Sequence, residues 1–127
     1  MTPPAHACVS VDLDGLWCYR EIHGLQRREA SDIDPAYSVG VRRLLEAFAE
    51  WKIPATLFAI GKDAERPAHA AMLLEADRAG HEIASHSWAH DYGLRHKRVW
   101  EIREDLRRAH EAIESAVGRA PVGFRAP

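Results

Sequence analysis

Features that mark secreted, membrane-bound or nucleic-acid-binding proteins are scarce in this sequence. Cys8 and Cys18 are the only cysteines, which does not resemble the disulfide framework of a small secreted domain. No apolar run approaches the ~20 residues of a membrane span. The segment before Cys8 holds two prolines and no lysine or arginine, unlike a secretory signal peptide. The formal net charge of -2 favours neither nucleic acid nor an anionic membrane as a partner. We therefore expect a cytoplasmic protein without a nucleic-acid or membrane partner.

What the sequence does contain is typical of one soluble globular domain. Its 127 residues are 46% hydrophobic and 28% charged, which suits one apolar core with a solvated surface. Short apolar, β-branched runs predict strands, and apolar residues at steps of three and four predict helices. The predicted strands cover 7–13, 55–60, 81–85 and 121–124, and the predicted helices cover 38–52, 63–80 and 99–117.

Strands and helices therefore alternate along the chain, which indicates an α/β fold with parallel strands. Ser38 and Asp63 are the expected N-caps of the first two helices. The segment 16–36 shows no regular pattern, and we expect it to be a long functional loop. Alternation of this kind builds either an open parallel sheet or part of a (β/α) barrel.

Polar side chains gather where the predicted strands end. Asp12 and Asp14 end the first strand, His86 and His90 follow the third, and Arg125 ends the fourth. The carboxyl ends of parallel strands lie on one face, where α/β folds place their active sites, so we expect these five residues to meet.

A carboxylate and two histidines form a common zinc set with an open position for a catalytic water. Taken alone, two histidines four residues apart are more often surface or capping residues, and Arg125 alone resembles an ordinary surface arginine. The paired carboxylates at the end of a buried strand favour a cation, because they are costly to hold together without one.

Three ordered motifs resemble those of the polysaccharide deacetylases that share the NodB homology domain (carbohydrate esterase family 4). These motifs are Asp12-Leu13-Asp14-Gly15, His86-Ser87-Trp88-Ala89-His90 and Arg125-Ala126-Pro127. The connecting runs Ile53–Phe58 and Gly80–His86 are also similar to the family's. The resemblance implies that 1–127 is the N-terminal portion of such a domain, the first half of a distorted (β/α) barrel. The family's later motifs, which supply a hydrophobic wall and an acid histidine, have no counterpart here.

The resemblance also implies a role for each motif residue. Asp14, His86 and His90 would bind a divalent metal, most simply zinc, with cobalt, nickel or manganese as alternatives. Asp12 would be the general base that takes a proton from the attacking water, and Arg125 would pair with it. The implied reaction is the metal-dependent hydrolysis of a carbon–nitrogen amide bond, and the implied substrate is an N-acetylated sugar or polysaccharide.

One departure from the commonest family pattern leaves alternatives open. Leu13 separates the two aspartates, a form that resembles a branch containing peptidoglycan deacetylases and relatives that act on ureides or cyclic imides. A cytoplasmic hydrolase of small cyclic amides is therefore a second hypothesis, and a non-catalytic remnant that binds metal or sugar is a third. Because half a barrel exposes open strand edges, we also expect either a homo-oligomer or a partner segment that completes the barrel.

Several aromatic and histidine residues have weaker assignments. Trp17 and Trp88 suit a sugar-binding surface, but core packing explains them equally well. Cys8 is expected to be a small buried residue and His81 a hydrogen-bonded core histidine. The remaining histidines with an assignment are expected at the surface: His6, His69, His96 and His110.

Overall fold

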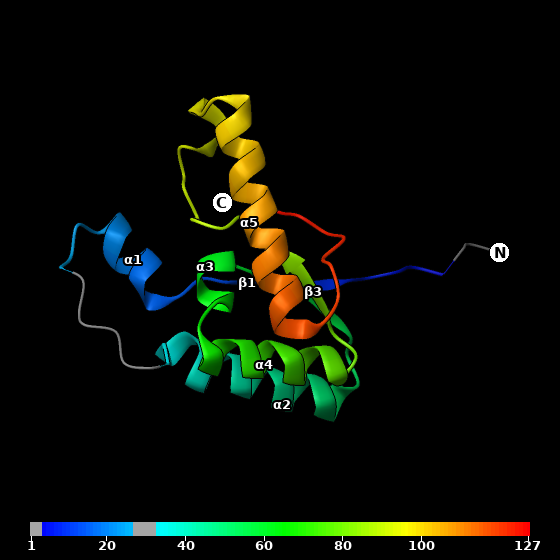
Figure 1. Ribbon diagram of the computed structural model, residues 1–127. Coiled ribbons are helices and arrows are strands. Elements are labelled where there is room, and N and C mark those ends of the chain that lie inside the picture. Colours follow the sequence, from blue (N-terminus) through cyan, green and yellow to red (C-terminus); the bar gives the residue numbers. More distant parts are fainter. Residues whose placement is uncertain (1–3, 27–32) are drawn as a thin grey trace.

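The computed structural model describes residues 4–26 and 33–127 and contains a parallel sheet in the order β1–β2–β3 (Figure 1). β1 is Val9–Leu13, β2 is Ala55–Ala59 and β3 is Glu82–Ser85. Both strand pairs are parallel, so the predicted α/β class is confirmed. The helical elements are α1 (Leu16–Ile22), the π-helical η1 (Ala36–Val41), α2 (Arg42–Trp51), α3 (Gly61–Ala64), α4 (Pro67–Arg78), the 3-10 turn η2 (Leu94–His96) and α5 (Val99–Val117).

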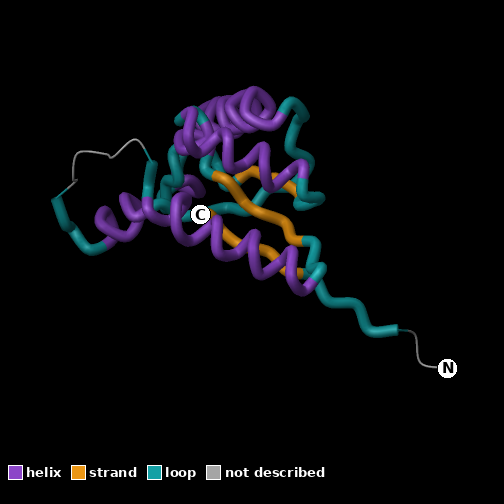
Figure 2. Tube along the Cα trace, turned by 90° about the horizontal axis from the view of Figure 1, so that it is seen from below, coloured by secondary structure: helices purple, strands orange, loops and turns teal. Residues whose placement is uncertain are grey.

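A single apolar core joins the sheet to the helices. Leu57 of β2, Leu73 of α4 and Ile113 of α5 are 1%, 0% and 0% exposed and belong to this core. Gly61 allows α3 to approach α5 closely, because a Cβ at that position would lie 2.7 Å from the Cα of Ala109. α1 stands apart from the other helices, and the segment that leads into β1 extends away from the body (Figures 1 and 2). Within the described ranges, no helix is long and apolar enough to cross a membrane.

The helix starts differ from the sequence-based expectation. Ser38 is not an N-cap, because the helical chain already begins at Ala36, whose backbone N–H donates to Asp34 Oδ1 at 2.8 Å. Asp63 is not an N-cap either: it lies inside α3, and a separate helix starts at Pro67. Proline is favoured in a first helical turn, where its missing N–H is not needed, and this explains the break between α3 and α4.

The expected long loop is wrong for its first part, since α1 covers Leu16–Ile22 and buries Cys18. The part of that loop at 27–32 lies outside the described residues. The expected fourth strand is reduced to one parallel bridge, between Ser85 and Phe124. The first strand starts at Val9 rather than at residue 7, which leaves Cys8 exposed and corrects its expected burial.

Burial on α5 predicts a sharp contrast between two aliphatic side chains of that helix. Ile113→Ala should lower the free energy of unfolding by about 2–5 kcal/mol, because it leaves a cavity in the core. Val99→Ala on the same helix should change it by less than about 0.5 kcal/mol, because Val99 is 73% exposed. Urea unfolding followed by circular dichroism measures both values, and equal losses would contradict this placement of the core.

Candidate metal centre

Three side chains from the carboxyl ends of β1 and β3 converge on one point. Asp14 Oδ1 lies 3.5 Å from His86 Nε2 and 3.2 Å from His90 Nε2. We call Asp14, His86 and His90 the metal group. Their potential ligand atoms all lie within 4.8 Å of one another. Donor atoms around a tetrahedral zinc ion, each about 2.0–2.1 Å from the metal, are about 3.3 Å apart. The two distances from Asp14 match this spacing, and the three residues are thus placed to hold a divalent ion.

The group is buried on one side and open on the other. His86 and His90 are 3% and 4% exposed, whereas the Asp14 side chain is 46% exposed. Burial lowers the pKa of His90, and the nearby Asp14 carboxylate opposes that effect only in part. A neutral imidazole is the form that binds a metal ion, so burial favours the required state at neutral pH. The open side leaves room for a water or a substrate atom.

A backbone contact fixes the orientation of His86. Its Nδ1 lies 2.8 Å from the carbonyl oxygen of Arg125. Since a carbonyl only accepts, Nδ1 must carry the proton, and the Nε2 lone pair points towards Asp14. The backbone of Arg125 is itself held by Ser85, whose carbonyl accepts its N–H at 2.9 Å. Contacts of this kind raise ligand basicity and hold the ring for a metal.

The stretch that carries His90 adopts a tight left-handed path. Ser87 and His90 have φ values of 64° and 53°, which residues other than glycine rarely adopt. The Ser87 hydroxyl accepts the His90 N–H at 3.0 Å. This local hydrogen bond stabilises the turn that brings His90 back beside His86.

Two helices hold the same stretch from outside. At the start of α3, the N–H groups of Gly61 and Lys62 donate to the carbonyls of Ser87 and Trp88 at 2.9 and 3.1 Å. From α5, the Asp105 carboxylate accepts the N–H groups of Trp88 and Ala89 at 2.8 and 3.0 Å. The histidine pair is thus positioned by a rigid frame, which is what a preorganised ligand set requires.

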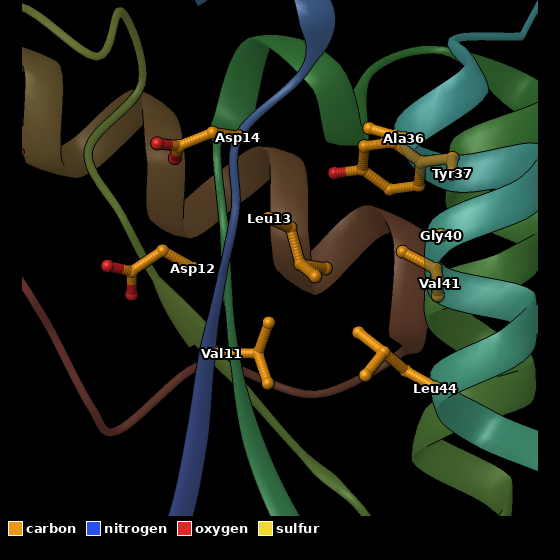
Figure 3. A pocket seen from close by; sticks show the side chains of 9 residues that line it. All are labelled: Val11, Asp12, Leu13, Asp14, Ala36, Tyr37, Gly40, Val41 and Leu44. Carbon is orange, nitrogen blue, oxygen red and sulfur yellow. The ribbon is translucent and has the colours of Figure 1, made fainter. Parts of the chain in front are cut away.

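Asp12 lies on the same side of β1 as Asp14, and Arg125 pairs with it. Figure 3 shows both carboxylates on one side of the strand, opposite Val11 and Leu13. The Arg125 guanidinium donates to Asp12 Oδ1 at 2.6 Å and to Ser10 Oγ at 2.8 Å. The arginine thereby orients the Asp12 carboxylate. The structure thus brings together all five polar residues that the strand ends indicated.

A cavity of about 150 Å³ lies along β1, and both carboxylates belong to residues that line it. Val11, Leu13, Tyr37 and Leu44 line it, between β1 and the η1–α2 segment (Figure 3). Its walls are mainly apolar and include Asp12 and Asp14 but neither His86 nor His90, so the cavity adjoins the three converging side chains through Asp14.

The two tryptophans have different surroundings. The Trp17 indole N–H lies 3.0 and 3.1 Å from the two carboxylate oxygens of Asp63, and its ring stands edge-on to His90 at 6.1 Å. The Trp88 indole instead donates to Glu65 at 2.9 Å, and the Arg108 guanidinium lies 3.5 Å from the Trp88 ring centre. Trp17 therefore borders the metal group, whereas the Trp88 ring packs against α5 and the end of α3.

Sequence patterns missed a buried polar cluster beneath α1. His69, expected at the surface, is 0% exposed and stacks on Tyr37 with ring centres 3.9 Å apart. Its Nε2 accepts the Asp34 N–H at 2.9 Å, and burial lowers its pKa to about 4, so the ring is neutral. Asp34 Oδ2 accepts the N–H of Leu16 at 2.9 Å. The cluster thus anchors the start of α1, next to Asp14.

Tyr92 is a second residue that sequence reasoning missed. Its ring stands edge-on to His90 with ring centres 4.9 Å apart, yet it is 51% exposed. Burial, with smaller contributions from Cys18 and Asp14, raises its pKa, so the phenol stays protonated at neutral pH.

The remaining histidine expectations hold: His81 is buried and accepts the Ala55 N–H at 3.2 Å, and His6, His96 and His110 are exposed.

Known proteins share both the sequence pattern and the fold. The sequence profile of the family described as polysaccharide deacetylase matches residues 30–127. A peptidoglycan deacetylase of Helicobacter pylori is 34% identical over 92 residues, which is 72% of this chain and 30% of that protein. The chain therefore spans about a third of the length of this relative.

Solved structures show the same likeness. One from Mycobacterium smegmatis, assigned as a polysaccharide deacetylase, is 31% identical with a TM-score of 0.74 over 94% of this chain and 42% of that one. A family 4 carbohydrate esterase from Streptomyces lividans, solved with acetate, has a TM-score of 0.69 over 96% of this chain and 50% of that one. At 20% identity the second match speaks for the fold alone. The chain belongs to the polysaccharide deacetylase family, as its three motifs predicted.

The buried Asp63 predicts a pH-dependent stability. Burial raises its pKa from 3.8 to about 6, an effect that the Trp17 hydrogen bond reduces. The folded state therefore holds the proton more tightly than the unfolded state, and stability should fall as pH rises from 3.8 to about 6 and then level off. Asp63→Asn keeps an oxygen for Trp17 and removes the charge, so it should be more stable than wild type at pH 7 by about 2–3 kcal/mol.

Urea unfolding at pH 4, 5, 6 and 7 measures this difference. The stability gap between Asp63→Asn and wild type should close towards pH 4. Asp77→Asn, at a partly buried carboxylate paired with Arg119, is the control and should show no comparable gain. A gap that is constant with pH would contradict the raised pKa of Asp63.

Proposed function

We propose that this chain carries the metal site and the general base of a deacetylase that removes the N-acetyl group from an amino sugar in a polysaccharide. The observation that carries the proposal is the juxtaposition of Asp14, His86 and His90 with the Asp12–Arg125 pair, in a chain of the polysaccharide deacetylase family. The peptidoglycan deacetylase activity named for the Helicobacter pylori relative supports a glycan substrate. Residues 1–127 would then be the N-terminal portion of the catalytic domain.

The donor set favours zinc as the metal. Two imidazole nitrogens and one carboxylate oxygen are ligands that zinc accepts readily, and cobalt, nickel or manganese can occupy similar sites. When bound, the ion supplies Lewis-acid polarisation of the amide carbonyl and lowers the pKa of a water. Asp14 and the two histidines need only hold their present orientations, which His86 Nδ1 and the Ser87 hydroxyl already fix.

Asp12 is the proposed general base. Its charge reaches His90, where it opposes the fall in the pKa of that histidine, so the carboxylate lies near the metal group. Arg125 occupies Asp12 Oδ1, which leaves Oδ2 to take a proton from a water that attacks the acetyl carbon. Arg125 holds the carboxylate in place for this proton transfer. As the carbon–nitrogen bond breaks, Asp12 gives that proton to the leaving nitrogen, which yields acetate and a free amine.

Hydrolysis of a small cyclic imide uses the same residues and remains the alternative substrate class. The Asp-x-Asp spacing is the feature that favours it. Release of acetate from acetylated chitotetraose, against ring opening of a cyclic imide, separates the two. The cytoplasmic location stays a prediction, as does association with a second copy or with a segment that completes the barrel.

The ligand assignment predicts selective loss of zinc binding. Asp14→Ala and His86→Ala should each raise the zinc dissociation constant by at least about 100-fold, because each removes one of three protein ligands. His110→Ala, at an exposed histidine on α5, is the matched control and should leave the constant unchanged. Competition with a chromophoric chelator measures the affinity, and unchanged binding in both ligand variants would exclude this site.

The base assignment predicts a loss of turnover without a loss of metal. Asp12→Asn should lower the rate of acetate release from acetylated chitotetraose by about 100- to 10,000-fold, since a neutral amide cannot accept the proton. Zinc affinity should stay within a few-fold of wild type, because Asp12 is not a proposed ligand. Asp77→Asn, which alters another carboxylate paired with an arginine, is the control and should leave the rate unchanged. A zinc-loaded wild type that hydrolyses only the cyclic imide would favour the alternative substrate.

A further inference from the structure

The ring of Tyr92 borders the metal group, although none of the three motifs predicts it there. Tyr92 follows the second histidine by two residues and stands edge-on to it, with an angle of 86° between the ring planes. It is nevertheless 51% exposed, so about half of its surface is left uncovered by the described parts of the chain.

The turn that carries Tyr92 is preorganised. Asp91 Oδ1 accepts the Gly93 N–H at 2.7 Å, and Asp91 Oδ2 pairs with Lys97 Nζ at 2.7 Å. Leu94, next in the turn, is 8% exposed, and its N–H donates to the Asp91 carbonyl at 3.0 Å. The backbone on both sides of Tyr92 is therefore held in place, and a ligand that packs against the ring has little loop entropy to overcome.

A second aromatic side chain reaches the same histidine from a different element. Trp17, on α1, is edge-on to His90 at 6.1 Å, and Asp63 holds its indole N–H. Tyr92 and Trp17 thus flank the metal group from the 91–97 turn and from α1.

This arrangement suits a pyranose ring. An amino sugar whose acetyl group lies at the metal has an apolar face of axial C–H groups close to the reacting bond, and aromatic rings pack well against such a face. We propose that Tyr92 is a substrate-binding residue that stacks on the sugar unit whose N-acetyl group is hydrolysed. The inference rests on the proposed function, because it takes an N-acetylated sugar as the ligand.

The test measures sugar binding apart from turnover. Isothermal titration of zinc-loaded protein with acetylated chitotetraose is carried out in the Asp12→Asn background, so that the sugar is not consumed. Added there, Tyr92→Ala should raise the sugar dissociation constant by about tenfold, the usual effect of losing one aromatic contact. Tyr92→Phe keeps the ring and should stay within about twofold.

Tyr19→Ala is the matched control. Tyr19 is 58% exposed, and its ring contacts His23 rather than His90, so its removal should leave sugar binding unchanged. Zinc affinity must also be unchanged in Tyr92→Ala. A fall in zinc affinity would overturn the proposal, since it would mean that the ring supports His90 rather than the sugar.

The remaining outcomes separate this inference from the proposed function. Equal sugar affinity in Tyr92→Ala and its parent would overturn the role of Tyr92 and leave the deacetylase proposal standing. Weaker binding in Tyr92→Ala, together with no acetate release by the protein that retains Asp12, would support the sugar contact and reject the proposed reaction. A zinc-loaded protein that binds no sugar at all would overturn both.

Discussion

The parallel pairing of β1, β2 and β3 is the constraint on which the metal group depends. Leu13 pairs with Ala59 and Ala59 with Ser85, so the next residue of the outer strands, Asp14 and His86, emerges at the same level. Parallel neighbours lie about 4.8 Å apart, which leaves the outer strands about 10 Å from each other. Side chains bridge that gap above the end of β2, where the chain turns away into α3. A shift of either pairing by one residue would separate the ligands.

Arg125 links the two roles that the proposed mechanism gives to His86 and Asp12. Its carbonyl fixes the ring of His86, and its guanidinium holds Asp12. It reaches both because its N–H donates to Ser85 at the end of β3. The single bridge that replaces the expected fourth strand is therefore sufficient to place the residue. In the proposed mechanism, metal ligand and base share one support, so a change in the backbone there would disturb both.

The sequence predicted the parts of the fold and site that depend on local pattern. Apolar periodicity predicted α5 to the residue, and the strand ends indicated where Asp14 and His86 would meet. Prediction from the sequence failed where a buried polar residue forms a hydrogen bond with a residue far away in the chain. His69 shows no local sign that Asp34 will donate to it, and Asp63 resembles a cap until Trp17 is brought next to it. Tyr92 was missed because its relation to His90 depends on two left-handed residues that no periodicity indicates.

The spacing of Asp12 and Asp14, with Leu13 between them, has a consequence for folding. Successive strand residues face opposite sides, so Asp12 and Asp14 share one side while Leu13 and Val11 enter the interior. A chain that paired β1 one residue out of place would bury both carboxylates and expose both aliphatic side chains. Such a misfolded form would lose apolar burial and carry two unpaired charges in the core. The spacing of the two aspartates thus also acts as a check on correct strand assembly.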